Sequence, residues 1–307
     1  MSITVVRPGL LTTVQDGGRW GHQHQGVPTA GPMDAFSFRL ANRLAGNHDW
    51  DAGLEITLLG PELLFDDEAI VAIAGADLSA SVPMGQACRI ARGQALRFGE
   101  RKSLTRAYLA VRGGIDIPPV LGSRSTSLPS GLPGLAGRPL RAGERLAIGS
   151  AREPRAALRR SRLTRPAPAD PLPVRFLWGP DRDRFTAADA DAFVSQVFRI
   201  SPNSNRMGYR LEGAALNVDP HAGRMLSEST PIGSIQVPPS GQPIVLMADR
   251  QTAGGYARIG TVISADLPLA GQLAPGETLR FVPCNMAAAL AALQDQERML
   301  AESVGPE

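Results

Sequence analysis

Glycine and proline interrupt this chain at short intervals along most of its length. The 307 residues include 33 glycines and 26 prolines, which are scattered among short apolar runs. Because both residues are disfavoured inside helices and central strands, this spacing is typical of many short strands joined by tight turns. We therefore predict a mainly β fold with a few short helices. At roughly 100–200 residues per domain, the length suggests two domains, each with its own core.

Three helices and a series of strands are predicted from the apolar periodicity. Residues 33–44 carry apolar side chains at helical spacing, and Gly46 stands where a C-cap is expected. Thr186 is predicted to cap a helix that runs to about Phe198, and Asn285 to cap a final amphipathic helix. The predicted strands are 3–6, 11–14, 54–59, 69–74, 87–91, 95–98, 108–111, 174–178, 235–237, 244–247, 259–264 and 279–282.

A change in composition divides the chain. Between residues 151 and 173 the apolar periodicity vanishes and arginine and proline dominate, which favours an interdomain linker. The predicted organisation is therefore a domain over 1–150, a linker over 151–173, a domain over 174–284, and a helix with a tail over 285–307.

The two halves also resemble each other. Triplets at 76–78 and 96–98 are echoed at 265–267 and 279–281, and the triplet at 38–40 resembles that at 209–211. Their common order suggests a duplication. Two related β-domains packed face to face would form a cleft, and such clefts are favoured ligand sites.

Composition excludes several other classes of protein. The net charge is only +3 and Lys102 is the single lysine, so we do not infer nucleic-acid binding from the pI of about 9.3. No run of ~18 apolar residues predicts a membrane span, and the start MSITVVRPG lacks the apolar core of a secretion signal. Cys88 and Cys284 fit no metal or redox spacing. We expect a cytoplasmic, reduced protein.

Polar, glycine-containing turns at strand ends hold the candidate site residues. The richest turn, 248–256, combines a carboxylate, a guanidinium, an amide, a hydroxyl, a phenol and two adjacent glycines. A surface turn does not require this combination, and rigidly held loops are where binding groups tend to lie. Similar polar turns occur around Asp16, around Arg124 and over 203–211.

Five segments carry a resemblance to a known family. They are LLTTVQDGGRWG, GVPTAGPMD, LAVRGGIDIPPVLGSRST, SPNSNRMGYRLEG and GSIQVPPSGQPIVLMADRQTAGGY. Together they resemble the KipA family, the C-subunit proteins of bacterial 5-oxoprolinase, which is related to the carboxyltransferase part of urea carboxylase (urea amidolyase). The resemblance covers residues 5–281. It implies two tandem cyclophilin-like β-barrel domains, each a carboxyltransferase subdomain, with a shared site between them.

The same resemblance implies an activity and partners. The family reaction is the ATP-dependent opening of 5-oxoproline to glutamate, carried out together with a KipI-like B protein and a third, A-type protein. Two alternatives stay open: a biotin-dependent carboxyltransferase acting on urea or another amide, and a regulator that binds a KipI-like protein. ATP is thus expected to be consumed by the complex, and biotin only under the first alternative. Because no G-x-x-x-x-G-K-[ST] motif occurs, any ATP binding here would not use a P-loop.

The sequence departs from the family pattern at two places. In 252–258 the family usually has a second threonine, and a proline and a lysine after the tyrosine, where this chain has Ala253, Ala257 and Arg258. Ser227-Glu228-Ser229 stands where a Ser-Asp-Gly-like turn is common in the family. Both departures bear on substrate specificity.

Both family reactions act on an N–C(=O) unit, and this chemistry selects the candidate residues. Arginine suits a carboxylate or phosphate because the guanidinium offers paired planar donors. Aspartate can orient an arginine or act as a base, glutamine can bind an amide edge, and adjacent glycines open backbone N–H groups to an anion. The predicted catalytic residues are Asp249, Arg250 and Tyr256; the predicted substrate-binding residues are Asp16, Arg124, Asn205, Arg206, Tyr209, Gln236, Gln242, Thr252, Gly254 and Gly255.

Several candidates have a structural alternative. Arg250 with Asp249 could be only an ion pair at a strand end, and Gly254-Gly255 only a hairpin turn. Tyr209 could be a packing residue with a bonded hydroxyl, and the serines beside Arg124 could brace a long loop. His22 and His24 are predicted on one face of a strand, but no third ligand has metal spacing, so no metal site is expected.

Overall fold

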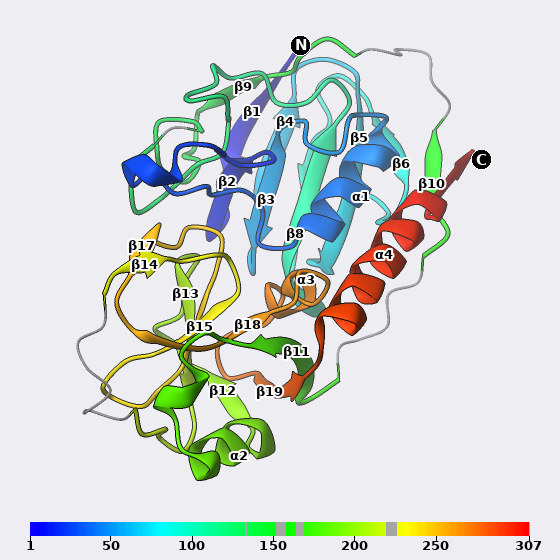
Figure 1. Ribbon diagram of the computed structural model, residues 1–307. Coiled ribbons are helices and arrows are strands. Elements are labelled where there is room, and N and C mark those ends of the chain that lie inside the picture. The colour runs from blue at the N-terminus through cyan, green and yellow to red at the C-terminus, as the bar shows by residue number, and fades with distance from the viewer. Residues whose placement is uncertain (133, 152–157, 164–168, 219–225, 307) are drawn as a thin grey trace. The chain divides into compact units, whose positions relative to one another are not determined.

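The computed structural model describes residues 1–132, 134–151, 158–163, 169–218 and 226–306 (Figure 1). The chain divides into two compact units. The first comprises residues 1–21, 29–167 and 298–307, and the second comprises residues 22–28 and 168–297. The predicted linker, 151–173, contains strand β10 (Arg159–Ser161) and the start of β11 (Leu172–Trp178). Its residues 152–157 and 164–168 lie outside the described ones.

In the first unit, strands β1 to β9 form two antiparallel sheets. Apolar residues of both, including Val5, Leu63, Leu54 and Leu109, make one buried core cluster. One sheet has the order β7-β4-β1-β9 and the other the order β2-β3-β8-β5-β6. Their bounds are β1 (Ser2–Arg7), β2 (Leu11–Gln15), β3 (Gly53–Thr57), β4 (Glu62–Phe65), β5 (Ala69–Asp77), β6 (Ala87–Ile90), β7 (Ala95–Arg97), β8 (Ser103–Val111) and β9 (Arg145–Ala147).

Helix α1 (Ala35–Ala45) packs on the five-stranded sheet, over β5 and β8 (Figure 1). It begins where the Asp34 carboxylate accepts a hydrogen bond from the Ser37 N–H at 2.9 Å, as an N-cap does. It ends at Gly46, whose φ of 83° is left-handed, which confirms the predicted C-cap. Its buried residues, among them Phe38 and Leu44, pack against Ala72 and Tyr108 of the sheet.

A buried polar network fixes the start of α1. The Tyr108 hydroxyl donates to Glu55 Oε2 at 2.9 Å and accepts from the Asp34 N–H at 2.8 Å, and Glu55 also accepts from the Met33 N–H at 2.8 Å. Burial, together with the negative charge of Glu55, holds the pKa of Tyr108 well above its ordinary value. The phenol therefore stays neutral and keeps its proton for this bond.

The second unit contains a closed barrel with the order β11-β18-β15-β16-β13-β12-β19. Neighbours are antiparallel except β11 and β19, which run parallel. Rings of Phe176, Phe193, Phe198 and Phe281 fill part of its core, with the Phe193 and Phe281 centroids 4.6 Å apart. The further strands are β12 (Phe198–Ile200), β13 (Gly208–Glu212), β15 (Ser234–Val237), β16 (Ile244–Leu246), β18 (Ala257–Val262) and β19 (Thr278–Pro283).

The remaining elements complete the described chain. They are η1 (Gln23–Gln25), η2 (Arg182–Arg184), α2 (Ala187–Ser195), α3 (Leu267–Ala270), α4 (Met286–Glu302), the paired strands β14 (Glu228–Ser229) and β17 (Ala253–Gly254), and β20 (Val304–Pro306), which pairs with β10. Asn285 caps α4 by accepting from the Ala288 N–H at 2.9 Å, as predicted. No helix in the described ranges has the length and apolar character needed to cross a membrane.

The mainly β prediction is confirmed, whereas three local predictions are wrong. The helix capped by Thr186 ends at Ser195, not near Phe198, because Phe198 and Ile200 turn into the barrel as alternating buried residues of β12. His24 lies in the 3₁₀ turn η1 and His22 just before it, so they do not share a strand face. Residues 38–40 are helical whereas 209–211 lie in β13, so that echo does not reflect matching structure.

Replacing Tyr108 with phenylalanine should destabilise the first unit. The change removes the hydroxyl between Glu55 and the Asp34 N–H, and an unsatisfied buried polar group costs about 1–3 kcal/mol. Urea unfolding followed by tryptophan fluorescence measures this in a Trp178→Phe background, where Trp20 and Trp50 report the first unit. The control Ser103→Ala, which removes an exposed hydroxyl from the same strand β8, should change stability by less than about 0.5 kcal/mol. Equal effects of the two variants would contradict the role of the network.

Candidate functional site

A buried ion pair lies at the base of the turn 248–256. Arg206 Nε and Nη2 lie 3.0 and 3.1 Å from Asp249 Oδ2 and Oδ1, and the two side chains are 4% and 0% exposed. The Asp249 N–H also donates to the Arg206 carbonyl at 2.8 Å. A paired guanidinium–carboxylate contact of this kind fixes orientation as well as distance. It therefore ties the loop before β13 to the loop after β16.

Arg250 extends this connection to a third segment. Its side chain is buried, and its Nε donates to the Thr230 carbonyl at 2.7 Å. Burial lowers the pKa of Arg250 to about 10, so the group is still cationic at neutral pH. Thr230 in turn donates its N–H to the Thr252 carbonyl at 3.0 Å. These bonds, together with the β14–β17 pairing, join 228–230 to 250–254.

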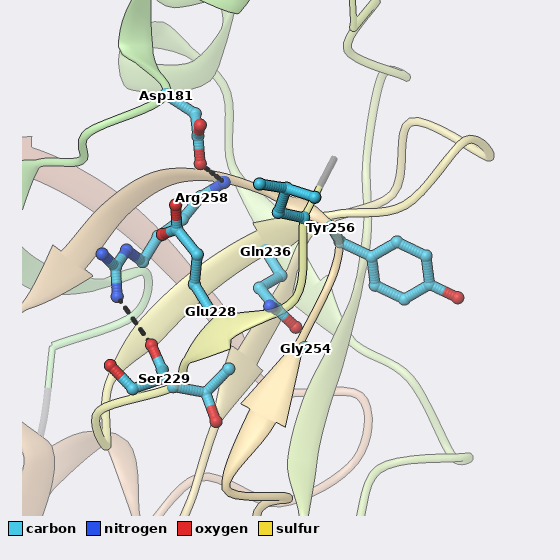
Figure 2. Close-up of a pocket in the computed structure, with 9 residues that line it drawn as sticks. Asp181, Glu228, Ser229, Gln236, Gly254, Tyr256 and Arg258 are labelled. Carbon is cyan, nitrogen blue, oxygen red and sulfur yellow. Dashed lines mark hydrogen bonds between the residues drawn. The ribbon is translucent and has the colours of Figure 1, made fainter. Parts of the chain in front are cut away.

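Beside these joined segments lies a hollow of about 230 Å³, a volume that includes space open to solvent (Figure 2). Strands β14, β15, β17 and β18 contribute to its wall, with the turn before η2. The lining residues are Asp181, Leu226, Glu228, Ser229, Thr230, Gln236, Gly254, Tyr256 and Arg258.

Gln236 and Arg258 face this hollow from neighbouring strands. They are register partners in the antiparallel pair β15–β18, and directly opposed residues of such a pair have their side chains on the same face. Gln236 is 3% exposed, and its side-chain amide makes no hydrogen bond to any other described residue. The Arg258 N–H donates to Asp181 Oδ2 at 2.9 Å and its Nη1 to the Ser229 carbonyl at 3.4 Å (Figure 2). Its buried Nε has no hydrogen-bond partner within the described ranges.

Gly254 packs against the Gln236 amide. A Cβ atom at this glycine would lie 2.8 Å from Gln236 Nε2 and 3.2 Å from Thr230 Cγ2. Any larger residue would push the amide out of its place. The hairpin alternative for Gly254-Gly255 is wrong, because Gly254 belongs to β17 and pairs with Glu228 of β14.

The other predicted residues of the second unit bind the main chain or face solvent. Tyr256 lines the hollow, but in Figure 2 its ring points away from Gln236 and Arg258. Gln242 uses both ends of its amide on Gly213, at 3.0 and 3.1 Å. The buried Tyr209 hydroxyl lies 3.2 Å from the Gly271 carbonyl, and Asn205 accepts from the Met207 N–H at 2.8 Å.

Asp16 and Arg124 belong to the first unit. One Asp16 oxygen accepts from the Ser123 and Ser125 hydroxyls at 2.6 Å each, and the other accepts from the Arg124 N–H at 2.5 Å. The Arg124 side chain donates to the Ile117 carbonyl at 2.6 Å and pairs with Asp116 at 3.2 Å. Asp16 therefore braces the Gly/Ser loop. A pocket that Arg124 shares with Arg206 and Arg250 stays a prediction.

Sequence reasoning missed several residues that line the hollow. Arg258, Glu228 and Ser229 stand out in the sequence only as departures from the family pattern, although a cation beside a polar turn is itself a signal for an anion site. Asp181 gave no signal, since its contact with Arg258 depends on the fold.

Comparison with known proteins places the chain in a family. It belongs to the carboxyltransferase domain family, whose model of subdomains A and B matches residues 25–283. It is 41% identical over 304 residues to the C subunit of Escherichia coli 5-oxoprolinase, covering 96% of each chain. It is 35% identical to urea amidolyase of Lachancea kluyveri, covering 92% of this chain but 17% of that protein. The structure of K. lactis urea amidolyase superposes with a TM-score of 0.89 and 32% identity, over 97% of this chain and 20% of that one.

Replacing Asp249 with asparagine should strongly destabilise the second unit. The change leaves the Arg206 charge buried without its counter-charge, which typically costs about 3–5 kcal/mol. Urea unfolding followed by the fluorescence of Trp178, with the other two tryptophans replaced by phenylalanine, measures the loss.

The matched control for this prediction is Asp191→Asn. It makes the same change at an exposed aspartate of α2 in the second unit and should cost at most about 0.5 kcal/mol. The double variant Arg206→Met/Asp249→Leu should regain part of the stability, because it removes both buried charges. A single Asp249→Asn variant as stable as the control would refute the assigned role of the pair.

Proposed function

We propose that this chain is the C subunit of a 5-oxoprolinase complex, which hydrolyses 5-oxoproline to glutamate with consumption of ATP. The observation that carries the proposal is the 41% identity to the C subunit of E. coli 5-oxoprolinase over 96% of both chains. A second relative with the same name, from Haemophilus influenzae, is 35% identical over 88% of this chain and 87% of its own. By contrast, the chain spans only 17% of the urea amidolyase of L. kluyveri.

The chemistry of lactam opening assigns roles to the site. The carbonyl must be activated and the ring nitrogen protonated as it leaves. Tyr256, whose exposed side chain lines the hollow, is the proposed proton donor, a role that requires its ring to turn toward Gln236 and Arg258 from the position seen in Figure 2. Asp249 and Arg250 are buried and bonded to neighbouring segments, so we assign them to positioning the turn that carries Tyr256. Thr252, Gly254 and Gly255 belong to the same turn.

ATP enters this proposal as a substrate of the complex, supplied with two partner proteins, one A-type and one B-type (KipI-like). The names of the urea amidolyase relatives favour one second candidate, a carboxyltransferase that acts on urea or another amide. Biotin would then arrive on a separate carrier protein. The regulatory alternative, binding of a KipI-like protein without turnover, shares its partner with the first candidate and differs in lacking activity.

Reconstitution tests the proposal. ADP release from ATP and 5-oxoproline should require this chain together with the A-type and B-type proteins, and should fall to background when any one is omitted. Avidin should leave the rate unchanged, since no biotin takes part. Full activity without this chain would refute the proposal, and avidin-sensitive turnover of urea would favour carboxyl transfer. Binding to the B-type protein with no turnover would favour the regulator.

A further inference from the structure

We propose that the hollow between β14, β15, β17 and β18 binds a small cyclic amide that carries a carboxylate, with Gln236 on the amide edge and Arg258 on the carboxylate. The inference rests on the proposed function and assigns the substrate-binding site to these two residues.

The Gln236 side chain matches a lactam better than it matches a linear peptide. A primary amide offers a carbonyl acceptor and an N–H donor side by side. A five-membered lactam is held cis by its ring, so its carbonyl and N–H also lie side by side, whereas a trans peptide points them in opposite directions. Two hydrogen bonds can therefore form between Gln236 and a lactam. Gln236 lines the hollow, and its amide forms no hydrogen bond with another residue of the described ranges, so its donor and acceptor face a ligand there.

The position of the amide is fixed by its surroundings. A Cβ atom added at Gly254 would lie 2.8 Å from Gln236 Nε2 and 3.2 Å from Thr230 Cγ2, so the amide packs closely on this glycine. Thr230 is itself held by Arg250 and by the main chain at Thr252. A preorganised binding group loses little conformational entropy when the ligand arrives. The glycine therefore serves the fit of the amide rather than a turn.

Arg258 supplies a cation at the right place for a carboxylate beside the amide. As a register partner of Gln236 it lies on the same face of the β15–β18 pair, with Cβ atoms of such pairs about 4.5–5.5 Å apart. In 5-oxoproline the carboxylate is attached to the carbon next to the ring nitrogen, so the anion and the amide edge are neighbours in the same way. The Nε donor of Arg258 makes no bond within the described residues and its Nη1 makes only a long one of 3.4 Å.

Two carboxylates also line the hollow, and neither prevents anion binding. Asp181 is paired with Arg184 at 3.3 Å and accepts the Arg258 N–H, so its charge is largely offset. Glu228 is exposed, and solvent ions screen exposed charges. Arg258 therefore remains the cation available to a bound carboxylate.

Direct binding to the full chain tests the assignment. Isothermal titration calorimetry would compare 5-oxoproline with 2-pyrrolidinone, which lacks the carboxylate, and with proline, which lacks the lactam carbonyl. We expect 5-oxoproline to bind at least about tenfold more tightly than either, since each partial ligand loses a charge-assisted or paired contact. Equal affinity for all three would overturn the inference.

Variants then separate the two contacts. Arg258→Gln should remove the preference for 5-oxoproline over 2-pyrrolidinone and leave 2-pyrrolidinone binding unchanged. Gln236→Leu should weaken both lactams about tenfold, and the isosteric Gln236→Glu should do the same if the leucine variant fails to fold. The controls Gln196→Leu and Arg199→Gln, on residues that bond to Ala214 and Gly276 outside the hollow, should bind as the unaltered chain does.

Turnover of the reconstituted complex distinguishes this inference from the proposed function. Raised KM for 5-oxoproline with unchanged KM for ATP, in both Gln236→Leu and Arg258→Gln, would support the site. Unchanged KM in both variants, in a complex that still needs this chain, would overturn the site and leave the proposed function standing. If the complex does not turn over but the chain shows the expected ligand preferences, the site stands and the proposed function fails.

Discussion

The contact on which the site of the second unit depends is the buried pair between Arg206 and Asp249. Removing two charges from water costs several kcal/mol per ion, and only close, paired geometry repays this cost. The pair is therefore favourable only when both loops hold this close geometry. Arg250 follows Asp249 directly and bonds to the Thr230 carbonyl. The ion pair therefore also helps to fix the positions of β14 and β17. The hollow lies beside those two strands, so its wall is positioned by a contact that does not line it.

In the first unit, two other buried carboxylates hold loops in place. The Asp16 carboxylate accepts hydrogen bonds from two serine hydroxyls and one backbone N–H of the loop around Arg124. The Glu55 carboxylate accepts from the Tyr108 hydroxyl and from the Met33 N–H just before α1. Loops rich in glycine lose much conformational entropy when they become ordered. Several hydrogen bonds to one buried acceptor offset that loss of conformational entropy. These glycine-containing segments are thus held by side chains that lie far away in the sequence.

The sequence predicted what local chemistry decides. The mainly β class, the Gly46 C-cap and the Asn285 N-cap all follow from residue preferences within a few positions. What could not be predicted depends on register. Gln236 and Gln242 look equivalent in sequence, since both stand beside the same Pro/Ser/Gly turn. In the structure, Gln236 faces the hollow, whereas Gln242 bonds to the main chain of Gly213. Likewise, the end of α2 at Ser195 cannot be predicted from neighbouring residues. It depends on the pairing of Phe198 with Leu279 of β19, which places Phe198 in the barrel.

The departures from the family pattern acquire a physical meaning in this setting. Position 258, where the family usually has lysine, carries a guanidinium whose residue is bonded through its backbone N–H to Asp181 and whose Nη1 reaches Ser229. An ammonium is a compact point charge without a planar donor fork, so it could balance a carboxylate but could not align it. The planar donors of an arginine at this position can also orient a bound carboxylate. Orientation matters here because Gln236, the cross-strand partner of Arg258, also presents a planar group. In the proposed binding mode, two planar groups on adjacent strands define the plane of the lactam, and specificity then follows from the β15–β18 register.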